Sequence, residues 1–130
     1  MSFSPDKVDY SKEDGLTDKQ RLTSFAQQTF EFLFVNYPII KISILSDFKD
    51  YQPRCNSVFT QMGFRFALRG NIPENKKQMI AFSLTSVMQT AFLSGENSQA
   101  VTGYDLTQKA QRELFISETV SMLMEGVYEE

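Results

Sequence analysis

The chain has 130 residues, of which 42% are hydrophobic, and its formal net charge at pH 7 is -3. A chain of this length normally forms one domain, and about two thirds of its unfolded surface can be buried on folding. The acidic balance argues against a surface that clamps nucleic acid, because such a surface needs clustered Lys and Arg to displace counterions from phosphates. The composition therefore predicts one globular domain that does not bind DNA well by itself.

Residues 1–16 are mostly polar and acidic, and we expect them to form a flexible arm. They lack the basic start and apolar run of a secretory signal, which predicts a cytoplasmic protein. Thr17 and Gln20 form a capping-box pattern, in which each side chain satisfies a backbone donor of the other at a helix start. This pattern predicts a helix over 18–36. Its apolar face recurs at spacings of three and four, at Leu22, Phe25, Ala26, Thr29, Phe32 and Leu33.

Pro38 cannot continue that helix, since it lacks an amide hydrogen, but it suits the first turn of a second helix over 38–48. Residues 39–45 alternate and are rich in β-branched side chains, so a strand is the alternative there. We prefer the helix because no other segment could pair with a strand. Asp50 and Pro53 are expected to open a third helix, with Gly70 as its C-terminal cap. The inner side of this helix is predicted to carry Val58, Phe59, Met62, Phe66 and Ala67.

Pro73 is expected to begin a fourth helix, in which residues 78–95 carry no charge. Such a length is typical of a membrane span. The segment has too many polar side chains for lipid, however, and this favours a helix that protein buries on nearly every side. Small side chains fall within one narrow arc of the helix, where they allow another helix to approach closely. They are Ser83, Ser86, Thr90 and Ser94.

A polar loop containing Gly103 follows, and Asp105 with Gln108 gives a second capping signature before a last helix that runs to about residue 126. The apolar positions of this helix span about half of its circumference, more than one neighbour requires. We therefore expect it to pack against its own domain and against a partner. The fold class predicted for the chain is all-α, with five or so helices in an antiparallel bundle. The apolar positions of the last helix are Leu106, Ala110, Leu114, Ile116, Val120, Leu123, Met124 and Val127.

The chain contains no histidine and a single cysteine, Cys55. The usual general base and commonest metal ligand are therefore missing, and neither an intrachain disulfide nor a thiolate metal cluster can form. Neither a nucleophile elbow nor a phosphate-binding glycine loop occurs. Arg65 and Arg69 share one helical face and can grip an anionic ligand, although a solvated face is the simpler interpretation. We expect a protein that binds rather than an enzyme, with no metal and no cofactor.

Residues 22–48, LTSFAQQTFEFLFVNYPIIKISILSDF, resemble the helix, proline-interrupted turn and short helix with which the regulatory domain of TetR/AcrR-family transcriptional regulators begins. Residues 71–127 are similar to that family's dimerisation pair, with a long uncharged helix, a polar loop and a closing helix that ends LFISETVSMLMEGV. The resemblance covers residues 18–127. The family's DNA-reading part is an N-terminal helix-turn-helix, which nothing in residues 1–15 could form. We therefore expect no direct binding of nucleic acid by this chain alone.

The resemblance implies that residues 17–130 form an effector-binding and dimerisation domain. A small apolar effector would lie between the helices, and the fourth and fifth helices of two subunits would form a four-helix bundle in a homodimer. Three alternatives remain. The aromatic and methionine side chains can form a dry core without a pocket. The chain can be a stand-alone adaptor that binds another protein or forms mixed dimers with full-length regulators, or an enzyme with a carboxylate in a polar cleft. The implied ligand-binding residues are Phe32, Met62, Phe66, Met88 and Phe92. The implied dimer-interface residues are Ser83, Ser86, Thr90, Ile116, Val120, Leu123 and Val127.

Overall fold

The computed structural model describes residues 15–128, and every regular element within them is a helix. A 3-10 turn (η1, Gly95–Asn97) and a short helix (α6, Ser98–Thr102) join the last two long helices. The all-α prediction is confirmed, and the segment around residues 38–48 is helical rather than extended. The predicted N-terminal arm lies almost wholly outside the described residues. The five longer helices are α2 (Asp18–Val35), α3 (Tyr37–Lys49), α4 (Asn56–Ala67), α5 (Glu74–Ser94) and α7 (Lys109–Met124).

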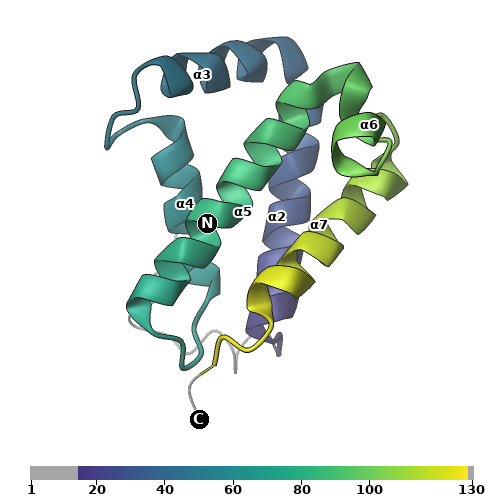
Figure 1. Cartoon of the computed structure of the whole chain (residues 1–130). Coiled ribbons are helices and arrows are strands. Elements are labelled where there is room, and N and C mark those ends of the chain that lie inside the picture. Colours follow the sequence, from purple (N-terminus) through teal and green to yellow (C-terminus); the bar gives the residue numbers. More distant parts are fainter. Residues whose placement is uncertain (1–14, 129–130) are drawn as a thin grey trace.

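Helix α5 crosses in front of α2, with α4 and α7 on either side, and α3 lies across one end of this group (Figure 1). The chain bends by 107° between α2 and α3. Asn36 ends α2, and Pro38 occupies the first turn of α3, where its missing amide hydrogen has no cost. Within residues 15–128 no single helix is long and apolar enough to cross a membrane, and α2 with α3 passes that test only as a bent pair, by length and composition.

The start of α2 is fixed by two sets of hydrogen bonds. The predicted capping box is confirmed, because Thr17 Oγ1 accepts from the Gln20 amide at 3.1 Å and Gln20 Oε1 accepts from the Thr17 amide at 2.9 Å. The buried Asp18 carboxylate pairs with Arg21 Nη1 at 2.9 Å and accepts from the Tyr128 hydroxyl at 3.2 Å. The first turn of α2 is thus hydrogen-bonded to Tyr128, which follows α7 in the chain.

The boundaries of α4 differ from their prediction at both ends. The helix begins at Asn56, beyond Pro53, and its C-cap is Leu68. Gly70 was wrongly predicted to be the cap, since it lacks the positive φ of a left-handed cap residue. Its amide donates to Asp18 Oδ2 at 2.7 Å, and a Cβ at this position would lie 2.7 Å from the same oxygen. Glycine is needed here because the backbone passes so close to the carboxylate.

The predicted inner side of α4 is wrong for three of its residues. Phe59, Met62 and Phe66 are 57%, 42% and 43% exposed, whereas Phe64 and Ala67 are buried. Apolar side chains surround most of α4, so their spacing alone does not tell which side meets the neighbouring helices. One apolar face of α4 is consequently left open to solvent.

The last two long helices also depart from their predictions. One side of α5 is open to solvent, so burial on nearly every side is wrong for this helix. Helix α7 begins at Lys109, later than predicted, and no side chain caps it. Asp105 instead accepts from the Thr107 amide at 3.2 Å and from Gln108 Nε2 at 3.1 Å, which makes a turn ahead of the helix. The buried side of α5 consists of Ile80, Ala81, Leu84, Thr85, Met88, Gln89, Ala91 and Phe92.

Aromatic rings occupy the part of the core where α2 meets α5 and α7. The Phe30 ring lies 5.0 Å from Phe34 and 5.9 Å from Phe115, between ring centroids. Phe92 of α5 packs against Phe34 at 5.2 Å and Tyr37 at 4.3 Å. Complete burial of one phenylalanine stabilises a fold by about 1.5–3 kcal/mol. This packing anchors α5 to α2 next to the point where α3 begins.

Candidate ligand pocket

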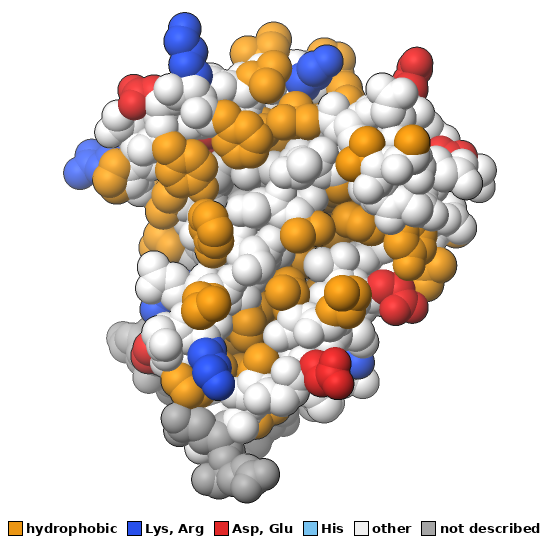
Figure 2. Space-filling view, in the orientation of Figure 1, with side chains coloured by type: hydrophobic (Ala, Val, Ile, Leu, Met, Phe, Trp, Pro, Cys, Tyr) orange, Lys and Arg blue, Asp and Glu red, His pale blue; other side chains and the backbone are white. Residues whose placement is uncertain are grey.

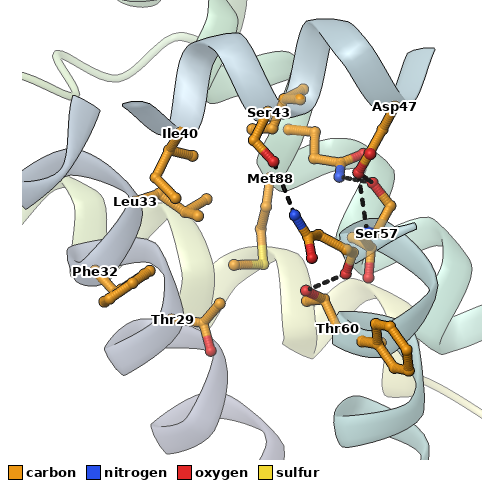
Figure 3. A pocket seen from close by; sticks show the side chains of 14 residues that line it. Thr29, Phe32, Leu33, Ile40, Ser43, Asp47, Ser57, Thr60 and Met88 are labelled. Atoms are coloured by element: carbon orange, nitrogen blue, oxygen red, sulfur yellow. Dashed lines mark hydrogen bonds between the residues drawn. The ribbon is translucent and has the colours of Figure 1, made fainter. Parts of the chain in front are cut away.

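A cavity of about 380 Å³ lies where α2, α3, α4 and α5 meet. In Figure 3, side chains from these helices point into it, with α3 across one end. Small-molecule sites typically have volumes of about 300–1,000 Å³ and combine apolar walls with a few polar groups. The cavity has the size and position of such a site.

One side of the pocket is apolar and ends in an aromatic rim. Leu33 of α2, Ile40 of α3 and Met88 of α5 line this side, and Met88 is only 1% exposed. Phe32 and Phe59 stand at the rim, with exposed fractions of 58% and 57%. These walls can bury the apolar body of a ligand, and the rings can close over it.

The other side of the pocket is polar because a side chain of α3 caps the N-terminus of α4. The N-cap residue, Cys55, makes no side-chain cap hydrogen bond. Asp47 of α3 supplies the acceptor, since its Oδ2 accepts from the Ser57 amide at 3.2 Å and from Ser57 Oγ at 3.0 Å. Gln89 Nε2 of α5 donates to Ser57 Oγ and extends the chain of bonds to a third helix. This chain defines the polar end of the pocket.

Thr85 lines the same pocket one helical turn before Gln89 and is 2% exposed. Its Oγ1 has no hydrogen-bond partner. A threonine inside a helix commonly donates to a backbone carbonyl of the preceding turn, as Thr60 does to Asn56 at 3.0 Å. A buried hydroxyl without a partner costs about 1–3 kcal/mol of stability. Thr85 therefore holds an unused hydrogen-bonding group at the cavity wall.

The structure brings together only part of the ligand set that the sequence predicted. Phe32 and Met88 line the pocket. Met62 and Phe66 lie on the outer side of α4, beside a second and more open hollow. Phe92 is fully buried in the aromatic core and contributes to neither. The predicted five residues therefore do not form one site.

The polar end of the pocket was missed from the sequence. Asp47, Ser57, Thr85 and Gln89 are not among the predicted ligand residues, since the sequence prediction rests on aromatic and methionine side chains. A signal did exist, since Thr85 and Gln89 are four residues apart on a helix that is otherwise apolar toward the core. Polar side chains on a buried helical face often mark a binding site or a hydrogen-bonded network.

The predicted dimer-interface residues divide between two environments. Ser83 and Ser86 are half-buried on the outer side of α5, and Thr90 is exposed there. Ile116 and Val120 of α7 are fully buried within the core of their own subunit, so they offer no surface to a second one. The half-buried Leu123 and Val127 pack against the same core. Ile116 and Val120 are thus excluded from an interface, whereas the α5 residues and, in part, Leu123 and Val127 remain accessible.

The remaining polar candidates form local pairs. Arg65 Nη2 lies 3.2 Å from Glu74 Oε2, and Arg69 Nε donates to the Phe66 carbonyl at 3.2 Å, so the two guanidinium groups do not converge on one site. Among residues 15–128, no three His, Cys, Asp or Glu side chains are placed to hold a metal ion. The pocket between α2 and α5 is therefore the site that the geometry favours.

Comparison with known proteins gives no match to this chain, either among family models, among curated proteins or among solved structures.

Proposed function

We propose that this chain is the effector-binding and dimerising domain of a TetR-like transcriptional regulator, and that its effector occupies the pocket between α2, α3, α4 and α5. The observation that carries the proposal is the buried Thr85 hydroxyl, which has no partner and lines a cavity with an apolar wall. A partner supplied by a ligand would remove the cost of that group. The order of helix, proline turn and short helix, followed later by a long helix without charge from residue 78 onward, adds support from the sequence.

A direct test measures binding of phenylbutanol, a probe with an apolar body and one hydroxyl, by two-dimensional NMR of the full chain. We expect saturable one-to-one binding with shifted amide signals from Thr85 and its neighbours on α3 and α4. Thr29→Trp places a large ring at the pocket wall and should abolish binding. Ser24→Trp adds the same ring at an exposed position of α2 and should leave binding unchanged. Equal binding by the two variants would refute the assigned pocket.

A second candidate function is a helical adaptor, and the surface at the α3 end of the molecule favours it. Val35, Ile39 and Ile42 are 78%, 74% and 71% exposed. Hydrophobic side chains also spread over the face that α5 crosses (Figure 2). Large exposed apolar patches commonly mark protein interaction sites. In sedimentation velocity, the regulator proposal expects a homodimer, whereas the adaptor expects a monomer that associates only with another protein.

A further inference from the structure

We propose that the ligand of this pocket is an organic cation, with an ammonium or amidinium group at the polar end and an apolar body against Leu33, Ile40 and Met88. This inference rests on the proposed ligand-binding function and names the chemical class of the effector. Asp47 is the only charged residue among the described residues that line the cavity. The pocket therefore presents one negative charge and no positive one.

The Asp47 carboxylate has no cationic partner within residues 15–128. Its hydrogen bonds in this part of the chain come from Ser57, and both reach the same oxygen, Oδ2. The dipole of α4 stabilises that oxygen, since the Ser57 amide belongs to the first turn of the helix. The other oxygen, Oδ1, keeps its lone pairs for a donor from outside the protein.

Two more acceptors line the same pocket as this carboxylate. Gln89 donates through Nε2 to Ser57, which leaves its Oε1 to accept a hydrogen bond. Thr85 lies one turn earlier on the same face of α5, and its hydroxyl has no partner. An ammonium group carries three donors and no acceptor, so it matches a site made of a carboxylate, an amide oxygen and a hydroxyl.

The apolar part of the pocket also favours a cation over an anion. Phe32 and Phe59 expose their rings at the rim, and these aromatic faces can attract a cationic ligand as it enters the pocket. An anionic ligand would place its charge near Asp47 in a partly buried site, where like charges repel more strongly than in water. A neutral ligand can fill the cavity but gives the Asp47 carboxylate no positive charge to pair with.

The test compares three probes of nearly equal shape at neutral pH, using isothermal titration calorimetry with the full chain. The probes are phenylbutylamine, phenylbutanol and phenylbutyrate, which carry a cation, a neutral hydroxyl and an anion. We expect the amine to bind about tenfold more tightly than the alcohol, as one charge-assisted hydrogen bond can provide. The carboxylate probe should bind more weakly than the alcohol.

The variant Asp47→Asn removes the charge and keeps an oxygen that can accept from Ser57, so the start of α4 retains its cap. In this variant we expect the amine to lose its tenfold advantage over phenylbutanol, because the charge that distinguishes the two probes is gone. Asp50→Asn is the matched control, because Asp50 is exposed, binds Gln52 Nε2 at 2.7 Å and does not line the pocket. This control should keep the preference of the wild type for the amine.

The outcomes separate the two proposals. Equal affinity of the wild type for amine and alcohol would overturn the cationic ligand and leave the pocket assignment intact, and this comparison needs no variant to fold. A preference for the amine that survives Asp47→Asn would overturn the pairing of the cation with Asp47. Failure of all three probes to bind would instead contradict the proposed ligand-binding function itself.

Discussion

The Thr85 hydroxyl is buried without a partner on a helix that otherwise turns apolar groups and Gln89 toward the core. Thr85→Val keeps the shape of the side chain and removes the hydroxyl. We expect its free energy of unfolding in urea to rise by about 1 kcal/mol, because the variant no longer buries an unpaired polar group. Thr90→Val on the exposed side of the same helix should change it by less than about 0.5 kcal/mol. A less stable Thr85→Val variant would mean that the hydroxyl stabilises the free protein.

Among residues 15–128, Tyr128 is the residue whose pKa should differ most from its ordinary value. Partial burial, followed by the negative charge of Asp18 and the hydrogen bond to it, raises the pKa of Tyr128 to about 12 from 10.0. The unfolded chain therefore loses this proton first, and its contribution to stability is complete below pH 10 and is lost as pH rises towards 12. The difference in phenolate absorbance between the wild type and Tyr128→Phe should titrate near pH 12. Asp18→Asn should lower that midpoint, and a midpoint near 10 in the wild type would contradict the contact.

At the scale of elements, α2 and α7 are joined by an ion pair with a fixed geometry. Arg112 Nε and Nη2 donate to the two carboxylate oxygens of Glu31 at 2.7 and 3.1 Å, and Nη1 donates to the Leu106 carbonyl at 2.9 Å. The guanidinium also lies over the Phe34 ring, 4.9 Å from its centroid. Lysine cannot reproduce the paired donors or the planar stacking. Arg112→Lys should therefore lower the free energy of unfolding by about 1–2 kcal/mol.

Arg65→Lys provides the control for that measurement. Arg65 pairs with the exposed Glu74 through one nitrogen, in solvent that screens the charges. Its replacement should change stability by less than about 0.5 kcal/mol. If both lysine variants lose the same amount in urea denaturation, the paired geometry of Arg112 has no special role.

The positions of the helices could be predicted from the sequence better than the side of each helix that packs against the core. Thr17 and Gln20 identified the start of α2, because a capping box depends only on neighbouring residues. Pro38 identified the break before α3 for the same reason. The side of α4 that meets the core could not be obtained in this way, since Phe59 and Phe64 give similar apolar signals and only contacts with other helices distinguish them.

The residues of the candidate site could be predicted from the sequence less completely than the helices. Phe32 and Met88 could be proposed from composition, because aromatic and methionine side chains line many apolar sites. Asp47 and Ser57 come from the end of α3 and the start of α4, and their pairing depends on how the loop between these helices closes. The periodicity of apolar residues in the sequence does not predict the conformation of this loop.

At the scale of the whole molecule, the proposed homodimer has one accessible surface on α5. Met79 and Phe82 are 64% and 53% exposed on its outer side, next to Ser83 and Ser86. Large apolar side chains beside small ones allow two helices to pack closely. The inward position of Ile116 within its own subunit removes the inner face of α7 from this contact. A stable dimer should bury about 1,200 Å² or more in total, so neighbouring helices must contribute around α5.

Ser86→Arg tests this surface, because a long charged side chain in the stripe of small residues would keep two α5 helices apart. Ser86 is only half-buried within the subunit, so the change should leave thermal stability of the monomer nearly intact. In sedimentation velocity at high micromolar concentration, we expect the wild type to be a dimer and Ser86→Arg a monomer. Ser24→Arg, at an exposed position of α2 away from α5, should remain dimeric. A monomeric wild type would refute the proposed homodimer. A dimeric Ser86→Arg variant would show that the interface does not lie on α5 and would favour the exposed apolar residues of α3.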